Sequence, residues 1–402
     1  MKNLLLLTLL FLSCLSASAQ HLIKGRVVDA QTNQPLEFVS VYANTTTIGT
    51  ATNAKGEFAL RLPDGKYELI VSFLGYEPLI YQVNTGALPP SVLFKLSPRQ
   101  NELKEVVIKG TRDKQWYDNL EVFKERFLGK DAFGRQSRLL NPEVLAITFD
   151  PETALLEVKA NEPLQVQNDA LGYKITYLLS DFRYYGRDGY VVYLGYPRYE
   201  LMEGSKSKKR RWARNRQKAY NGSLMHFMRA VQQEQLEQQG FNLRRLHRTP
   251  NPNRPTDEEI AAARAALRAR GSGARIEDGD SISDILSRAR LPKVIESLDI
   301  NPVPYSDYLQ KDSTASKLSF KGFYQIVYTG EKEEQGYLLQ ESMFNKRQPT
   351  FQTSVLSLQT DAVLLEPNGN VSDPLSLFVE GYWGWEKLGA MLPLDYQPAL
   401  AK

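Results

Sequence analysis

The chain has 402 residues, of which 42% are hydrophobic and 24% are charged, as in an ordinary folded protein. Its 50 basic and 46 acidic side chains leave a net charge of +4, which is too balanced to predict a nucleic-acid-binding protein. This length allows about two or three domains, each large enough to bury a hydrophobic core.

The first residues, MKNLLLLTLLFLSCLSASAQ, have the pattern of a secretory signal peptide. Lys2 supplies the positive charge, Leu4 to Leu15 form a short apolar core, and Ala17-Ser18-Ala19 is a small-residue cleavage site. The apolar core is too short to span a bilayer, and no later stretch approaches about eighteen consecutive apolar residues. We therefore expect a signal peptide at residues 1–19 and a mature chain that begins at Gln20.

A second possibility is a lipid anchor at Cys14, the only cysteine of the chain. The residues before it, Phe11-Leu12-Ser13, lack the aliphatic residue that lipoprotein processing normally requires three places upstream, so cleavage after Ala19 is favoured. That cleavage removes Cys14 and leaves a mature protein without disulfides, which suits a bacterial periplasm. The predicted location is the periplasm or the outer membrane.

Residues 22–108 alternate between apolar and polar side chains, with turn residues between the runs. The alternating runs include Ile23, Gly25 and Val27, and later Phe58, Leu60 and Leu62. Turn chemistry recurs at about ten-residue spacing, for example at residues 33–35, 53–56 and 63–65. Six or seven short strands at this spacing predict a small antiparallel β-sandwich, with Gly49 and Gly56 at hairpin positions of positive φ. Phe58 and Tyr76 are expected to fill the space between its sheets.

An ordered series of motifs in this region resembles the carboxypeptidase-like regulatory domain of Bacteroidota envelope proteins. The series comprises G-x-V-x-D (Gly25 to Asp29), Pro35-Leu36, Gly49-Thr50-x-Thr52-Asn53, Gly56-x-Phe58 and Gly75-Tyr76, followed by LKEVVI at residues 103–108. The resemblance implies an all-β transthyretin-like (prealbumin-like) sandwich at residues 20–108, of a kind often placed ahead of TonB-dependent receptors. It implies no zinc carboxypeptidase activity, because the zinc site of those enzymes lies in a separate domain.

The rest of the chain, residues 109–402, is predicted to form a larger α+β domain. Trp116, Leu120, Phe123 and Phe127 form one apolar helical stripe that ends at Gly129. Strands are expected at residues 144–149, 155–160, 173–182, 190–196, 320–329, 336–344 and 353–359, with a hairpin at 150–153, and a helix is expected from Ser223 to Gly240. The last part, DPLSLFVEGYWGWEKLGAMLPLDYQP, is read as a strand that runs into a short helix. This domain resembles the uncharacterised C-terminal part of Bacteroidota proteins that carry the same N-terminal module, on landmarks such as ALGYKITYLL, WARNRQKAYNGSLMHF and GYWGWEKLGAMLPLDY.

Residues 249–280 differ in composition from their surroundings, since they are rich in Pro, Arg and Ala. Thr256 and Glu259 have the spacing of a capping box, which predicts the start of a helix. We expect an exposed, flexible segment at 249–280 that contains one surface helix.

The run KSKKRRWARNRQK, Lys206 to Lys218, holds eight cations and one tryptophan. Its basic patch comprises Lys208, Lys209, Arg210, Arg211 and Arg214. A solvated helix face is one interpretation of these charges, and a contact for an anionic envelope polymer or an acidic partner is the other. Trp212, Arg216 and Tyr220 have the spacing of one amphipathic face and are candidate ligand-binding residues.

A second set of candidate ligand-binding residues is Tyr382, Trp383 and Trp385, which could stack against sugar rings or close the hydrophobic core. Ser223 and His226 share a helix face but lack a G-x-S-x-G elbow, so a capping serine and a flanking histidine are favoured over a catalytic pair. His226 and His247 lack the H-x-x-E and H-E-x-x-H spacings of zinc peptidases. The sequence therefore predicts no catalytic residue, no metal ligand and no cofactor.

Two hypotheses of function follow from these patterns. The favoured one is an exported, non-catalytic accessory or binding protein of the bacterial cell envelope. Its partners would be an outer-membrane TonB-dependent transporter or another envelope protein, or a glycan or anionic envelope polymer, and no nucleic acid. The alternative is a glycan- or peptide-directed hydrolase whose site lies in residues 113–402.

Overall fold

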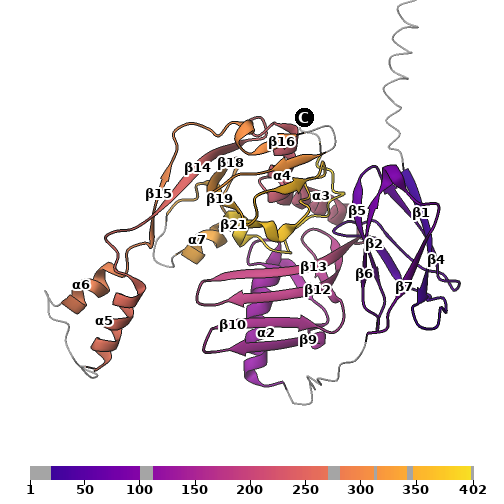
Figure 1. Ribbon diagram of the computed structural model, residues 1–402, viewed down its shortest axis with the longest axis horizontal. Helices are drawn as coiled ribbons and strands as arrows, with labels where there is room; N and C mark the ends of the chain where they lie inside the picture. The colour runs from indigo at the N-terminus through magenta and orange to yellow at the C-terminus, as the bar shows by residue number, and fades with distance from the viewer. Residues whose placement is uncertain (1–19, 100–111, 270–280, 312–314, 342–346, 400–402) are drawn as a thin grey trace, which may run out of the picture. The chain divides into compact units, whose positions relative to one another are not determined.

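The computed structural model describes residues 20–99, 112–269, 281–311, 315–341 and 347–399 (Figure 1). The predicted signal peptide, Cys14, the LKEVVI segment and residues 270–280 of the predicted flexible segment lie outside these ranges. The described parts of 1–221, 334–346 and 385–402 form one compact unit, and those of 222–333 and 347–384 form a second. Strands outnumber helices among the described residues, and the chain combines an all-β sandwich with a larger α+β part, as predicted.

The predicted sandwich is present at the start of the first unit. One sheet has the order β4-β1-β7 and the other the order β3-β2-β5-β6. The strands are β1 (Gln20–Asp29), β2 (Ser40–Ala43), β3 (Gly49–Ala51), β4 (Glu57–Pro63), β5 (Lys66–Ser72), β6 (Leu79–Asn84) and β7 (Val92–Leu96). Apolar side chains at alternate positions meet between the two sheets, and Phe58 lies among them as expected, stacked on Phe94.

Two details of the predicted sandwich are wrong. The β1–β7 pair is parallel, because β7 returns to the first sheet after the hairpin of β5 and β6 has formed on the other. Gly56 has the expected positive φ of 73°, whereas Gly49 is not among the residues of positive φ and lies within β3. A Cβ at Gly49 would lie 2.9 Å from the Cβ of Tyr42, so this glycine serves close approach between neighbouring strands.

A six-stranded antiparallel sheet and one helix follow the sandwich in the first unit. The sheet has the order β8-β11-β12-β10-β9, and β13 pairs with β12. Phe123 and Phe127 of the helix pack against Phe182 and Tyr177 of the sheet, as the predicted apolar stripe requires. The elements are α2 (Lys114–Leu128), β8 (Ser137–Leu139), β9 (Leu145–Asp150), β10 (Leu155–Ala160), β11 (Leu164–Asn168), β12 (Tyr173–Tyr185), β13 (Tyr190–Leu201) and α3 (Lys206–Tyr220).

Backbone hydrogen bonds join the sandwich to β13. The Thr45 amide donates to the Pro197 carbonyl at 2.8 Å, and the Tyr199 amide donates to the Thr46 carbonyl at 3.0 Å. The buried hydroxyl of Tyr42 also donates to the carbonyl of Tyr196. The sandwich and the sheet that contains β13 therefore lie in one compact unit. The predicted domain boundary after residue 108 lies outside the described residues and stays a prediction.

The segment after α8 (Tyr382–Trp385) completes the first unit by capping α2. The amides of Leu388 and Gly389 donate to the carbonyls of Phe127 and Leu128, which end the helix. The fully buried Asn168 donates to the Gly389 carbonyl at 2.8 Å. Leu388 and Gly389, within the motif GYWGWEKLGAMLPLDY, thus link the end of α2 to the end of β11.

The second unit contains a five-stranded sheet of order β15-β14-β18-β19-β21 and a three-stranded sheet of order β16-β17-β20. The expected strand before the short C-terminal helix is β21. The strands are β14 (Phe241–Pro250), β15 (Val294–Leu298), β16 (Leu309–Lys311), β17 (Ser316–Leu318), β18 (Phe323–Lys332), β19 (Phe351–Leu358), β20 (Val363–Leu365) and β21 (Leu377–Gly381).

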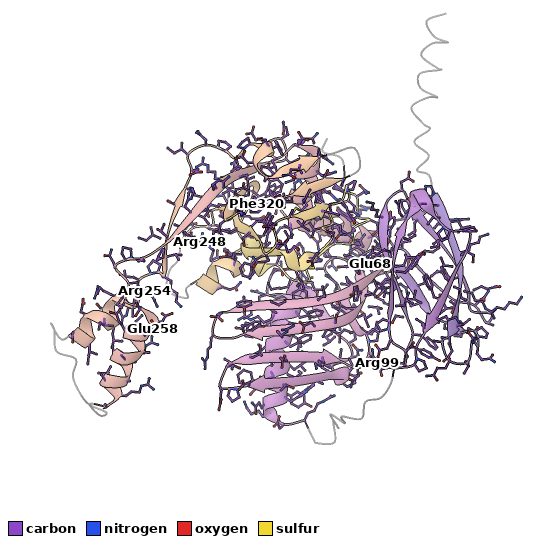
Figure 2. The ribbon with its side chains drawn as sticks, viewed as in Figure 1. Glu68, Arg99, Arg248, Arg254, Glu258 and Phe320 are labelled. Carbon is purple, nitrogen blue, oxygen red and sulfur yellow. The ribbon has the colours of Figure 1, made fainter. Side chains whose placement is uncertain are left out.

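The second unit contains the helices α4 (Leu224–Gln233), α5 (Asp257–Ala269) and α6 (Ser281–Arg288). The capping box is confirmed, since the Thr256 amide donates to the Glu259 carboxylate and the Glu259 amide donates to the Thr256 hydroxyl. Figure 1 shows β14 and β15 extending toward α5 and α6. Arg248 of β14, labelled in Figure 2, donates to Glu296 of β15 and to both carboxylate oxygens of Glu380, and so links the sheet's two edges.

Two predicted elements are wrong in type or length. The helix that begins after Ser223 ends at Glu234 instead of Gly240, because Glu234 takes a left-handed conformation and Leu236 turns into the core. The predicted strand at 336–344 begins as a helix, α7 (Gln335–Glu341). The consecutive apolar residues Tyr337, Leu338 and Leu339 suit a strand or a helix, and in the helix Leu338 is buried while Leu339 is 56% exposed.

Candidate functional site

Helix α3 is the element that carries the strongest concentration of charge. The side chain of Ser205 caps its first turn by accepting a hydrogen bond from the Lys208 amide. Trp212, Ala219 and Tyr220 are buried on one side of the helix. The predicted amphipathic face is therefore present, and it faces the interior of the first unit.

The buried face of α3 forms hydrogen bonds with the loop between β11 and β12. Four consecutive carbonyls of this loop accept hydrogen bonds from three side chains of the helix. The pairs are Trp212 Nε1 to Asp169 at 3.0 Å, Asn215 Nδ2 to Ala170 at 2.7 Å, Arg216 Nε to Leu171 at 2.8 Å and Arg216 Nη2 to Gly172 at 3.2 Å. Because these bonds satisfy backbone groups of a tight loop, they fix the helix on the sheet.

Gly172 and Tyr173 complete this contact. A Cβ at Gly172 would lie 2.3 Å from the Trp212 ring, and the residue has a φ of +70°, so glycine is needed here on both counts. The guanidinium of Arg216 lies 4.2 Å from the centre of the Tyr173 ring. Trp212 and Arg216 therefore make their contacts within the protein, and Tyr220 is buried on the same helix. The predicted role of these three residues in ligand binding stays a prediction.

The opposite side of α3 presents a continuous basic face. At about 100° per residue, five cations fall within an arc of about 140°. They are Lys206, Arg210, Arg211, Arg214 and Lys218, all exposed, and we call them the basic face. Lys208 and Lys209 flank this arc and are also exposed.

Few of these cations have acidic neighbours. Lys209 pairs with Glu203 at 2.8 Å, and Lys218 lies 3.8 Å from Glu334. Among the described residues, no carboxylate lies within ion-pair distance of the other exposed cations of the helix, which are Lys206, Lys208, Arg210, Arg211 and Arg214. An anion approaching this face would therefore meet cations that the fold leaves without acidic partners.

This arrangement costs the helix stability. Lys206–Arg210 and Arg210–Arg214 are like-charge pairs at i,i+4 spacing, each destabilising by about 0.2–0.5 kcal/mol. The first turn holds cations and no acidic residue, which also opposes the helix dipole. A bound anion would relieve both effects.

The three C-terminal aromatic residues are buried and do not form one platform. Tyr382, Trp383 and Trp385 are each less than a tenth exposed. Trp383 packs against Phe227 in the second unit, whereas Trp385 contacts Tyr337 in the first. Their burial agrees with the core-packing alternative and leaves a sugar ring no exposed aromatic face at these positions.

Ser223 and His226 are in the positions of a helix cap. The Ser223 hydroxyl accepts a hydrogen bond from the His226 amide, as expected of a capping serine. His226 is buried, and its Nδ1 accepts a hydrogen bond from the Gly222 amide, so the other ring nitrogen donates to Gln239. Burial lowers the pKa of His226, which keeps the ring neutral.

A buried carboxylate after the end of α2 has no signal in the residue pattern. Asp131 is 2% exposed, and its Oδ1 accepts hydrogen bonds from the amides of Phe133 and Gly134. Burial raises the pKa of Asp131 and lowers the pKa of Lys387 to about 8. A Cβ at Gly129 would lie 2.5 Å from Asp131 Oδ2, so the tight turn after α2 folds this carboxylate back against Gly129.

The raised pKa of Asp131 predicts how its substitution should respond to pH. Below the unfolded pKa both states are protonated, and as pH rises the unfolded state ionises first, so the wild-type chain loses stability over this range. The stability of Asp131→Asn relative to wild type should therefore increase from about pH 4 to about pH 7. Urea unfolding across this range measures the difference.

Asp150→Asn is the control with the opposite sign. A hydrogen bond from Thr153 lowers the pKa of Asp150, so its contribution to stability is present at neutral pH and is lost as pH falls. Relative to wild type, Asp150→Asn should become less stable as pH rises from below the ordinary aspartate pKa of about 3.9 to about pH 5, and its relative stability should then stay level up to pH 7. Parallel curves for the two variants would contradict the assignment for Asp131.

Two clefts lie in the second unit; one is lined by Phe320, Gly322 and Asp361, and the other by Arg245, Asp299 and Asp307. In the latter, Arg245 lies between the two carboxylates, at 4.0 and 3.6 Å. Within the described ranges, no group of three or more His, Cys, Asp or Glu side chains could hold a metal ion. None of the described helices is both long and apolar enough to cross a membrane.

The comparison with protein families agrees with the sandwich. Residues 23–108 match the family model of the CarboxypepD_reg-like domain. No curated protein matches the chain. The family match covers the sandwich and none of the second unit.

Solved structures give weak similarities. One is a Bacteroides fragilis NCTC 9343 protein described as membrane-associated and of unknown function, 12% identical over 90% of this chain and 93% of that one, with a TM-score of 0.16. Another is 3-chlorocatechol 1,2-dioxygenase from Rhodococcus opacus 1CP, 16% identical over 21% of this chain, with a TM-score of 0.16. The aligned part spans 62% of the length of that dioxygenase. At such TM-scores neither similarity supports an inference about this chain.

Proposed function

We propose that this protein is an exported, non-catalytic binding protein of the bacterial cell envelope, and that the basic face of α3 binds an anionic envelope polymer. The observation that carries the proposal is the set of exposed cations on one side of a helix whose other side is fixed to the protein. The signal-peptide pattern and the CarboxypepD_reg-like domain support an envelope location. In this role the protein would act as an accessory to an outer-membrane TonB-dependent transporter or another envelope protein.

The electrostatics of the basic face favour a polyanion over a single small anion. The cations follow the helix axis over about three turns, so a row of phosphates or carboxylates can meet several of them at once. Each Lys or Arg near an anionic surface contributes about 1 kcal/mol at moderate ionic strength. A lipopolysaccharide or phospholipid surface presents such a row of charges.

Vesicle flotation with the purified mature chain tests this proposal. We expect the protein to float with vesicles that contain phosphatidylglycerol or lipopolysaccharide and to remain behind with pure phosphatidylcholine vesicles. Raising the salt from about 0.15 M to about 1 M shortens the Debye length from about 8 Å to about 3 Å and should release the protein. Equal binding to neutral and anionic vesicles would contradict the proposal.

The envelope location has its own test. Cell fractionation followed by intact-mass measurement should find the chain outside the cytoplasm, beginning at Gln20. A diacyl or triacyl mass on Cys14 would instead show the lipid anchor. A cytoplasmic protein that keeps residues 1–19 would overturn the export part of the proposal.

A further inference from the structure

Three arginines form a compact group at the centre of the basic face. Arg210, Arg211 and Arg214 are exposed, and Arg214 lies four residues after the first and three after the second. Residues at these spacings on a helix have Cβ atoms about 5–6 Å apart, so the three guanidinium groups can reach one point above the helix. Exposed Ser207 lies three residues before Arg210 and four before Arg211, on the same face. We call the three arginines the arginine cluster.

The arginine cluster has no partner of its own within the described part of the chain. No hydrogen bond or ion pair there engages the side chains of Arg210, Arg211 or Arg214, whereas neighbouring Lys209 pairs with Glu203 at 2.8 Å. Each guanidinium carries five N–H donors and no acceptor. The cluster therefore offers many donors and a concentrated positive charge to an approaching anion.

The exposed side of α3 carries no large apolar residue. Ala213 is the one apolar residue at its exposed positions, and Trp212 and Tyr220 are buried against the protein. Helices that insert into a bilayer present Trp, Phe or Leu to the acyl chains. Binding by α3 must therefore come from contacts with headgroups, so the chemistry of the headgroup determines the affinity.

Arginine distinguishes between anions of different shape. A guanidinium donates two parallel hydrogen bonds to phosphate oxygens, which the ammonium group of lysine cannot do. A phosphomonoester offers three acceptor oxygens and a charge of about −1.5 to −2 at pH 7. A phosphodiester has a single charge and fewer free oxygens, so it satisfies fewer of the donors of the cluster. Three neighbouring guanidinium groups thus match a monoester better than a diester.

We propose that the arginine cluster binds a phosphomonoester displayed on a membrane surface, such as the phosphate of phosphatidic acid or of a phosphorylated glycolipid. The Ser207 hydroxyl donates to the same phosphate, while Lys206 and Lys218 at the ends of the basic face meet neighbouring headgroups. This inference rests on the proposed function and deepens it, because it predicts a preference between anionic surfaces of equal charge.

Flotation of the purified mature chain tests the preference. Vesicles that contain phosphatidic acid are compared with vesicles that contain phosphatidylglycerol, and the two are matched in zeta potential. Wild type should bind the phosphatidic acid vesicles at least about fivefold more tightly. In Arg210→Lys/Arg211→Lys/Arg214→Lys, which keeps every charge, the ratio of the two affinities should fall below about twofold. Arginine and lysine have nearly equal helix propensities, so α3 stays folded in this variant.

The matched control replaces three exposed arginines elsewhere, in Arg61→Lys/Arg244→Lys/Arg264→Lys, and should keep the wild-type ratio. Equal affinity of wild type for the two matched vesicles would overturn this inference and leave the proposed function standing. A triple variant of the cluster that keeps the wild-type ratio would overturn it as well. Binding to neither kind of vesicle would contradict the proposed function itself, and this inference with it.

Glucose 1-phosphate, a soluble phosphomonoester, separates a membrane source of the phosphate from a free one. It meets the cluster without neighbouring charges for Lys206 and Lys218. It should therefore displace the protein only at a concentration at least about tenfold above that of the accessible phosphatidic acid. Displacement at equal concentration would assign the cluster to a soluble phosphate ester and overturn the membrane source.

Discussion

Reversing two charges on the basic face of α3 should abolish binding to anionic vesicles and leave the protein folded. In Arg210→Glu/Arg211→Glu, two attractive charges become repulsive, a loss of about 4 kcal/mol at about 1 kcal/mol per charge, or roughly a thousandfold in affinity. The same substitution should raise the melting temperature slightly. Each new glutamate lies one turn from cations, so four like-charge pairs become opposite-charge pairs, each worth about 0.2–0.5 kcal/mol.

The matched control for this variant is Lys24→Glu/Lys66→Glu, which changes the net charge equally at exposed positions of the sandwich. We expect it to bind anionic vesicles nearly as wild type does. Flotation gives the binding, and thermal unfolding by circular dichroism gives the stability. If both double variants lose binding equally, the attraction comes from net charge, and the basic face is not the site.

Much of the fold could be predicted from local patterns. Alternation located the sandwich strands, and the stripe from Trp116 to Phe127 located α2. Local patterns failed where tertiary contacts determine the type of an element or the pairing of a strand. Residues 336–344 have apolar residues that suit either a strand or a helix, and the helix α7 was missed. The parallel return of β7 also has no local signal, because it depends on which sheet edge is open.

The candidate site was only half predictable for the same reason. The spacing of Trp212, Arg216 and Tyr220 predicted one face of a helix. The spacing could not predict whether that face is buried or exposed. Its partners are backbone carbonyls of the loop from Asp169 to Gly172, and every residue type carries such a carbonyl. Burial of Trp383 and Trp385 could not be predicted either, since the same aromatic residues would serve an exposed platform.

Substitutions of Trp212 distinguish a packing role of this side chain from a ligand-binding role. Its side chain is 3% exposed and donates a hydrogen bond to the Asp169 carbonyl. Trp212→Ala should therefore lower the free energy of unfolding by about 3–5 kcal/mol and the melting temperature of this unit by roughly 10 °C. Trp212→Phe keeps most of the ring volume and loses the hydrogen bond, so its loss should be smaller, about 1–3 kcal/mol.

Vesicle binding by Trp212→Phe then decides between the two roles. If the ring only fixes α3 to the loop before β12, the folded variant presents the same basic face and should bind anionic vesicles within about twofold of wild type, less than 0.5 kcal/mol. Reduced binding with unchanged stability would show that Trp212 contacts the ligand itself. Because the basic face depends on an anchored helix, Trp212→Ala should lose binding only at temperatures where the first unit begins to unfold.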